Sequence, residues 1–429
     1  MELIVRLKQH TPIIHFQWDQ KGATLRATEF KPKLDRYIKK KYYGNDQNIR
    51  LKYQVRIKYL SPLTINGTQK NLHKDSMFFG NLNQPEHKKK FEIYGSELEL
   101  RFNTHFDTKL KTQIEETLPI CLALENFGTR NNKGNGCFFY KDKTINDFEA
   151  VLKQYAAPSS VCYWDCNFSD AIFSIKTVYS LLKSGINLTS NPVLSKTAYN
   201  TLEKDYKIDF NLLKSETLIR QINSTGYYEV FLNTAKKKKI ELSSSAYGFL
   251  KKMKKETYYK SLLFKYFKDK NITWDKKAIK MKFLPTVNSD KWYSNDQKFV
   301  RGLLGISDVQ SWHTYNKTLT IKSNMFERVP SPIVFKVFDK DNGQTRIYFF
   351  AKDFYMHLLG KTFKFTMSGC GGDLDLDIPN YFDINQYMEY AVGEINNLNI
   401  NNNGSVTTGL VKKVDYILTK VKSSQIKKL

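Results

Sequence analysis

A glycine-rich loop that carries two cations is the stretch of this sequence best suited to holding phosphate. Residues 126–140 read NFGTRNNKGNGCFFY. The glycines and cations within it are Gly128, Arg130, Lys133, Gly134 and Gly136. Glycine permits positive φ and close backbone approach, so such a turn can lay N–H groups along a phosphate chain while nearby cations neutralise its charge. The spacing leaves open an alternative, an ordinary helix-to-strand connection whose glycines only make the turn.

Further cations lie on a predicted helix near the start of the chain and in two lysine-rich segments. Residues 26–44 place Leu34 and Ile38 at helical spacing, with Pro32 in the predicted first turn. The candidate phosphate-binding cations here are Arg26, Lys31, Lys33 and Arg36. The segments AKKKKI and FLKKMKK add Lys236, Lys237, Lys251 and Lys252. Lysine-rich faces are usually only solvated, and that interpretation stays open for these segments.

Catalytic residues are sparse by comparison. A metal-independent ribonuclease would need a general acid and base, commonly His with Tyr or Lys, and His15 follows the first predicted strand. A lone histidine is more often structural. The acidic run DLDLD, residues 373–377, could suggest a metal site, but its alternation is more typical of an exposed strand or loop edge. We therefore expect no metal, no cofactor and no catalytic set.

The overall charge points to a polyanionic partner. Lys and Arg number 68 against 42 Asp and Glu, a net charge of +26, and aromatic residues make up 14%. Exposed aromatics on a basic surface suit stacked single-stranded bases. No apolar run approaches the roughly 20 residues of a membrane span, which places nucleic acid ahead of a membrane. The five cysteines are scattered, with only Cys162 and Cys166 close together, and are expected to be reduced thiols in a cytosolic protein.

The first part of the chain predicts a particular order of elements. Strands are expected at 2–9, 51–60, 91–102 and 137–140, and helices at 26–44 and 107–127, the second bent at Pro119. The strand 51–60 alternates, with Lys52, Gln54, Arg56 and Lys58 on its outer, basic face. The order strand, helix, strand, strand, helix, strand is that of a ferredoxin-like unit.

The second part is less regular. Residues 160–290 are predicted to be mostly helical and very basic, and strands return between 316 and 366. A short helix is expected near 384–398, and VDYILTKV is predicted to be a last strand before a basic tail. A second, diverged ferredoxin-like unit fits this half.

Several short motifs, in this order, resemble the RAMP superfamily of CRISPR-associated RNA-binding proteins, and most narrowly the first subunit of the Cmr (type III-B) effector complex. The stretches that carry the resemblance are TPIIHFQ (11–17), LRATEFKPKLDRYI (25–38), SMFFGN (76–81), NFGTRNNKGNG (126–136), RGLLGISD (301–308) and ERVPSPIVFKVF (327–338). They span nearly the whole chain, and their order is more specific than any one of them.

The resemblance implies an α+β protein with two ferredoxin-like (RRM-like) RAMP domains and a large helical insertion in the second half. We expect an N-terminal domain at 1–158, containing the loop 126–137, and a second domain at 159–429 that includes the basic region 160–290. The implied function is non-catalytic binding of CRISPR guide RNA towards its 3′ end, of its target RNA, or of both, beside other RAMP subunits in a prokaryotic cytoplasm. Two alternatives remain: a metal-independent repeat-RNA endoribonuclease that uses His15, and a basic scaffold for other subunits.

Overall fold

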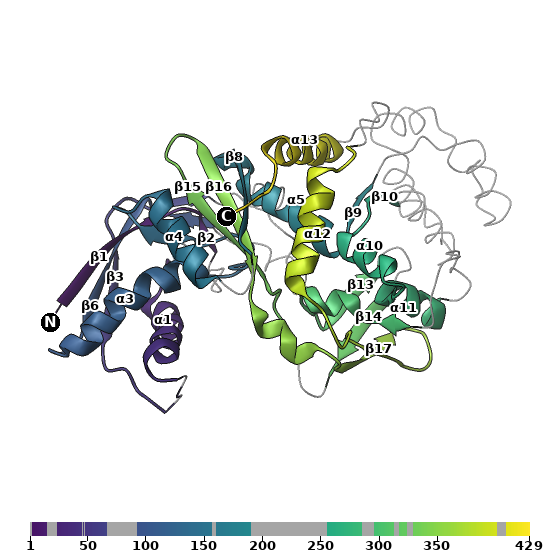
Figure 1. The fold of residues 1–429 in the computed structure, drawn as a ribbon, viewed down its shortest axis with the longest axis horizontal. Helices are drawn as coiled ribbons and strands as arrows, with labels where there is room; N and C mark the ends of the chain where they lie inside the picture. The colour runs from purple at the N-terminus through teal and green to yellow at the C-terminus, as the bar shows by residue number, and fades with distance from the viewer. Residues whose placement is uncertain are drawn as a thin grey trace, which may run out of the picture.

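The structure, a computed structural model, describes residues 2–14, 24–44, 46, 48–66, 92–156, 160–189, 255–284, 296–312, 317–323, 329–400 and 409–429. The described residues contain three four-stranded antiparallel sheets. Two of them organise the two halves of the chain, each with a layer of helices (Figure 1), and the third is formed by strands inserted into the second half. Helices and strands are mixed throughout the chain, as the sequence predicts for the α+β class.

The first sheet has the strand order β3-β6-β1-β7, and all of its neighbouring strands are antiparallel. Its strands are β1 (Glu2–Gln9), β3 (Gln54–Tyr59), β6 (Glu97–Asn103) and β7 (Phe138–Tyr140). The helices α1 (Ala27–Tyr42) and α3 (Thr108–Leu124) bury apolar side chains such as Phe30, Leu34 and Ile114 in one core with Leu7 and Leu100 of the sheet. The side chains of each strand alternate between the two faces of the sheet, and most of the apolar ones lie on the face that packs against the helices.

The predicted order of elements in this half is confirmed, with two local differences. Helix α1 begins at Ala27, so Pro32 lies inside the helix rather than in its first turn. The predicted strand 91–102 is divided into β5 (Glu92–Tyr94) and β6, and β5 pairs instead with β2 (Ile13–Ile14) and β4 (Thr64–Asn66). The break falls at Gly95, where a Cβ atom would lie only 2.4 Å from Cδ1 of Tyr59.

The second sheet repeats the connections of the first. Its strand order is β15-β16-β8-β19, and all of its pairs are antiparallel. Its strands are β8 (Cys162–Asn167), β15 (Ile333–Asp339), β16 (Gln344–Ala351) and β19 (Lys427–Lys428). Helix α5 (Ala171–Lys183) follows β8, and helix α13 (Gly409–Ser424) precedes β19. In both sheets the first strand in the chain lies between the third and the fourth.

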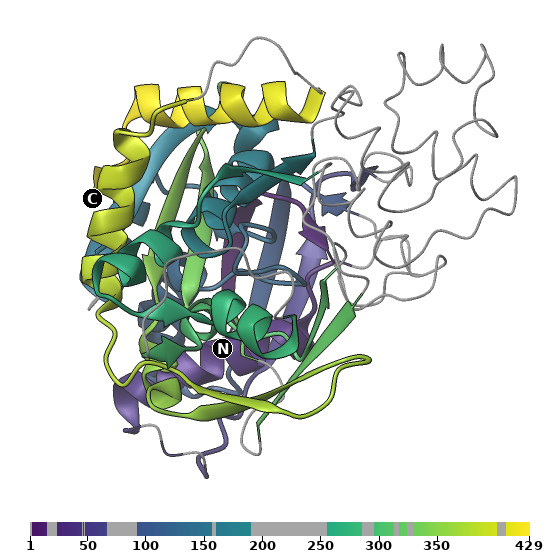
Figure 2. The same cartoon turned by 90° about the vertical axis from the view of Figure 1, so that its right-hand side faces the viewer.

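Long insertions separate these elements of the second half. The inserted helices and 3₁₀ helices are α10 (Leu262–Asp269), α11 (Asp275–Phe283), η5 (Val300–Leu304), η7 (Asp353–Leu358) and α12 (Ile384–Asn396). The inserted strands are β9 (Ile186–Thr189), β10 (Lys255–Tyr259), β11 (Thr273–Trp274), β12 (Gln297–Lys298), β13 (Val309–Trp312), β14 (Lys317–Lys322), β17 (Thr362–Met367) and β18 (Leu374–Asp377). Figure 2 shows α12 and α13, in yellow, along two adjacent edges of this half. None of the helices in the described ranges is long and apolar enough to cross a membrane.

One prediction about the second half is wrong and another is met only in part. Residues 160–290 are described at 160–189 and 255–284, where the helices η2 (Phe168–Asp170), α5, α10 and α11 alternate with the strands β8, β9, β10 and β11. The segment VDYILTKV is not a strand but part of α13. Its buried residues Val414, Ile417, Leu418 and Val421 follow helical spacing, which outweighs the β-branched composition.

The hairpin of β15 and β16 joins the two halves. Phe335 and Phe349 pack into the core of the second half, whereas Phe338 and Tyr348, on the opposite face, pack into the core of the first. Helix α4 (Ile145–Tyr155) contributes Phe148 to that first core. Both faces of the hairpin are covered by the protein. The amino-acid sequences of its two strands are therefore nearly continuous apolar runs.

Candidate nucleic-acid interface

The glycine-rich loop lies between the two halves and is hydrogen-bonded to both. On one side, the Gly136 N–H donates to the Pro12 carbonyl at 2.9 Å and the Thr129 N–H donates to the Ile14 carbonyl at 2.6 Å. On the other side, the Phe335 N–H of β15 donates to the Asn132 carbonyl at 3.2 Å. The side-chain amide of Asn126 also donates to the Phe335 carbonyl, at 2.8 Å. The loop therefore connects the two sheets.

The three glycines serve this connection rather than an open phosphate cradle. Gly128, Gly134 and Gly136 have φ values of +81°, +80° and +68°. A Cβ atom at Gly136 would lie 1.9 Å from the Phe127 carbonyl oxygen. Their N–H groups already donate within the protein, to Glu29, Asn131 and Pro12 respectively. The prediction that these N–H groups line a phosphate path is thus not met by the structure, because the groups are buried and already paired.

Lys133 is also placed differently from the prediction. Its ammonium nitrogen is buried, has no hydrogen-bond partner, and lies 2.6 Å from the centroid of the Tyr179 ring. Burial, followed by the charges of Lys183 and Arg130, holds its pKa well below the usual lysine value. A buried ammonium cannot contact a phosphate in solution. Arg130 is partly exposed and has a φ of +59°, a region that non-glycine residues rarely occupy.

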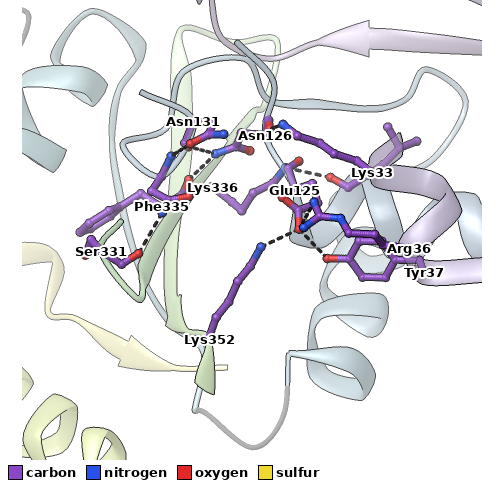
Figure 3. A network of polar contacts seen from close by, with 12 residues as sticks. Lys33, Arg36, Tyr37, Glu125, Asn126, Asn131, Ser331, Phe335, Lys336 and Lys352 are labelled. Atoms are coloured by element: carbon purple, nitrogen blue, oxygen red, sulfur yellow. Dashed lines mark hydrogen bonds and ion pairs between the residues drawn. The ribbon is translucent and has the colours of Figure 1, made fainter. Parts of the chain in front are cut away.

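Helix α1 brings one of its predicted cations to the loop. The Lys33 ammonium lies 3.0 Å from the Glu29 carboxylate and donates to the Asn126 carbonyl at 2.7 Å (Figure 3). The same Glu29 carboxylate accepts from the Gly128 N–H at 2.7 Å. The predicted proximity of Lys33 and the glycine-rich loop is therefore present in the structure.

Arg36 lies one turn further along α1, beside a shared carboxylate. Its guanidinium is 4.0 Å from Glu125, and its side chain is 64% exposed. Lys352 of the second half contacts the same carboxylate at 2.7 Å, and the Tyr37 hydroxyl donates to it at 2.9 Å (Figure 3). Burial alone would raise the pKa of Glu125, but the Lys352 charge and the Lys352 and Tyr37 hydrogen bonds outweigh burial and lower that pKa.

A further lysine comes from the middle of β15. The Lys336 ammonium donates to the carbonyls of Leu122 and Glu125, each at 2.8 Å, and burial lowers its pKa to about 8. Neither Lys336 nor Lys352 is among the site residues predicted from the sequence. The position of Lys336 in the apolar strand IVFKVFD was a usable signal, since a buried lysine needs partners.

We name Lys33, Arg36, Lys336 and Lys352, with the carboxylates of Glu29 and Glu125, the junction cluster. Four cations from both halves here face two carboxylates, so positive charge is in excess. Arg36 and Lys352 are the most exposed cations of the cluster, with Lys352 26% exposed against 14% for Lys33. Such a surface attracts anions and suits phosphate contacts.

The other predicted site residues lie elsewhere. Arg26 is the residue before α1 and is partly exposed. The Lys31 ammonium bonds to Asp35 at 2.7 Å and lies over the Tyr53 ring, on a different side of α1 from the cluster. Four lysines and the candidate catalytic histidine lie outside the described residues: Lys236, Lys237, Lys251, Lys252 and His15.

The acidic run and the cysteines offer no alternative site among the described residues. Asp377 of β18 accepts from Thr362 at 2.7 Å, and Asp373 pairs with Lys364 at 3.2 Å, in keeping with the exposed strand edge that was predicted. The described residues contain no group of three or more His, Cys, Asp or Glu that could hold a metal ion. All five cysteines are free, and burial raises the pKa values of the Cys162 and Cys166 thiols to about 12.

Two family models and a solved structure are similar to this chain. The Cmr1 N-terminal domain matches residues 1–186, and the Cmr1 C-terminal domain matches residues 258–422. A crystal structure of Cmr1 from Pyrococcus furiosus in its apo form aligns over 82% of this chain and 88% of that chain, with 10% sequence identity and a TM-score of 0.35. A search of curated proteins found no match. The two domain matches cover most of the sequence, and the chain therefore belongs to the Cmr1 family of subunits of the Cmr, or type III-B, CRISPR effector complex.

Proposed function

We propose that this protein is a non-catalytic RNA-binding subunit of its effector complex. It binds the guide RNA as a single strand, towards the 3′ end, or paired with its target, and so takes part in antiviral defence. Its other partners are the neighbouring RAMP subunits, and it works in a prokaryotic cytoplasm. The junction cluster is the observation that carries this proposal, because cations from both halves gather there in excess of their carboxylates.

The fold supports the same proposal. Each half has the chain order strand, helix, strand, strand, helix, strand, with the first strand between the third and the fourth and all neighbours antiparallel. We infer two ferredoxin-like units on this basis. The excess of cations lies where these units meet, so a strand of RNA bound there would contact both.

Three cations of the junction cluster provide the test. A Lys33→Ala/Arg36→Ala/Lys352→Ala variant should bind single-stranded RNA more weakly. The slope of log affinity against log salt should become shallower by about 2, since each lost contact to a single strand accounts for about 0.7. Fluorescence anisotropy at several salt concentrations, in EDTA, measures both quantities, and a denaturing gel of the same mixtures reports cleavage.

The control removes the same charge from exposed lysines elsewhere, as Lys153→Ala/Lys361→Ala/Lys427→Ala. Circular dichroism establishes whether both variants are folded. If the junction variant is not folded, Arg36→Ala alone replaces it. An unchanged affinity and slope in the folded junction variant would contradict RNA binding at this site. Site-specific cutting in EDTA would contradict the non-catalytic role.

A further inference from the structure

The first sheet has a second, uncovered face that is basic. Helices α1 and α3 lie on one side of the sheet (Figure 1), and on the other side the outward residues of β1, β3 and β6 are mostly exposed. We name this surface the open face and define it by Arg6, Gln54, Arg56, Lys58, Arg101 and Asn103. All six of these side chains belong to exposed residues. The open face does not include the end of the sheet nearest Lys8, because Lys8 forms an ion pair there with Asp339 of the second half at 3.2 Å.

The strand register brings these cations together. Arg56 lies directly opposite Arg101, and Lys58 and Arg6 both lie opposite Glu99, on either side of β6. Like charges directly opposite each other destabilise a sheet, so folding alone does not account for the Arg56–Arg101 pair. Arg101 is compensated by Glu99 and, at 3.9 Å, by Glu2. Arg6, Arg56 and Lys58 form no ion pair with any residue in the described part of the chain.

The composition of this face distinguishes between two forms of nucleic acid. Proteins that bind single strands stack bases on exposed aromatic rings. No outward position of β1, β3 or β6 is aromatic; the one large apolar residue there is Ile4, which is 48% exposed. A surface of cations and amides without rings suits a duplex, whose bases are already stacked and whose phosphates and 2′-hydroxyls remain accessible.

We propose that the open face binds the backbone of double-stranded RNA. Arg6, Arg56 and Lys58 contact phosphates. The amides of Gln54 and Asn103, which lie opposite each other in the register, offer a donor and an acceptor to 2′-hydroxyls in the minor groove. This inference rests on the proposed function only in taking RNA as the partner, and it uses residues separate from the junction cluster.

The test compares a blunt RNA duplex with one of its strands, by anisotropy across a salt series. An Arg6→Ala/Arg56→Ala/Lys58→Ala variant should bind the duplex more weakly, with a salt slope lower by about 2 to 3, since each duplex contact accounts for about 0.9. Its affinity for the single strand should be unchanged. The junction variant should bind the single strand more weakly, with an unchanged affinity for the duplex. The two proposed sites are therefore tested independently of each other. The matched control is Lys153→Ala/Lys361→Ala/Lys427→Ala.

Three results would overturn the inference. The first is an unchanged duplex affinity and salt slope in the triple variant, and the second is an equal loss of affinity for single strand and duplex in that variant. The third is displacement of labelled duplex from the wild type by poly-glutamate as effectively as by unlabelled duplex. The last result would indicate an acidic protein surface as the partner. If the triple variant does not fold, Arg56→Gln alone should lower the duplex slope by about 0.9. A duplex of DNA with the same sequence should bind more weakly than RNA, because it lacks the 2′-hydroxyl.

Discussion

Buried lysines are the most unusual residues of this protein. Besides Lys133 and Lys336, the Lys183 ammonium is buried and donates to the Gly305 carbonyl at 2.7 Å. Burial, and then the charge of Arg301, lower its pKa to about 7, against a partial opposing effect of Asp275. In the unfolded chain the same group holds its proton to a much higher pH. These lysines therefore make stability depend on pH.

The sign of this dependence follows from proton binding. Between about pH 7 and pH 10 the unfolded state binds more protons at Lys183 than the folded state does, so the lysine costs stability at low pH and this cost falls as pH rises. As pH rises from about 7 to 10, we expect the free energy of unfolding of the wild type to increase relative to that of a Lys183→Met variant. The increase should be at most about 1.4 kcal/mol per pH unit. Urea denaturation at several pH values measures the difference, with the exposed Lys361→Met as control. A gap that does not change with pH would contradict this account of Lys183.

At the scale of elements, the glycine-rich loop depends on close backbone approach. Gly136 donates to Pro12 and accepts from Phe127, so the loop closes on itself and on the segment after β1 at one point. The contact with Phe127 leaves no room for a side chain at Gly136. The sequence indicates a special conformation here, but the reason for it is the packing of the loop inside the protein.

Gly136→Ala tests this reasoning. The new Cβ atom would lie 1.9 Å from the Phe127 carbonyl oxygen, and the backbone has a φ of +68°. The conformation alone costs about 1 to 2 kcal/mol, and the overlap should bring the total loss of unfolding free energy above about 3 kcal/mol. Gly44→Ala is the matched control, because Gly44 has a φ of +59° with nothing within 4 Å of the added atom. Equal losses in the two variants by urea denaturation would show that the overlap does not matter.

At the scale of the whole molecule, the β15–β16 hairpin makes the two halves one structure. Phe338 stacks on His10 of the first half with ring centroids 4.3 Å apart and packs against Phe148 at 5.3 Å. The His10 ring is buried and accepts from the Asp339 N–H at 3.1 Å. The hairpin therefore belongs to the cores of both halves, and the halves should unfold together.

Phe338→Ala should weaken the packing of the hairpin against the first half. Loss of a buried phenylalanine costs about 3 to 5 kcal/mol, and we expect the single thermal transition of the wild type to separate into two. Differential scanning calorimetry measures both effects. Tyr381→Ala, at a residue that is 70% exposed, is the control and should leave the transition unchanged. A single, unshifted transition in Phe338→Ala would mean that the hairpin does not couple the halves.

Local patterns in the sequence were sufficient for part of this description. The alternation of residues 51–60 predicted the strand β3 and its basic outer face, and the order of elements in the first half followed from periodicity and turn residues. The excess of cations is likewise evident from the sequence alone, and the polyanionic partner that it indicates stays a prediction. These properties depend on residues that are neighbours in the chain, so a single sequence contains them.

The tertiary structure decided which residues meet. It buried Lys133 under Tyr179, brought Lys336 and Lys352 beside Glu125, and placed Arg56 opposite Arg101. It also determined that β8 and β19, at opposite ends of the second half, pair in one sheet. Contacts between residues this far apart depend on packing and strand register, which local periodicity does not specify. The charge of this protein is therefore a property of its sequence, whereas the places where that charge gathers at the surface are a property of its fold.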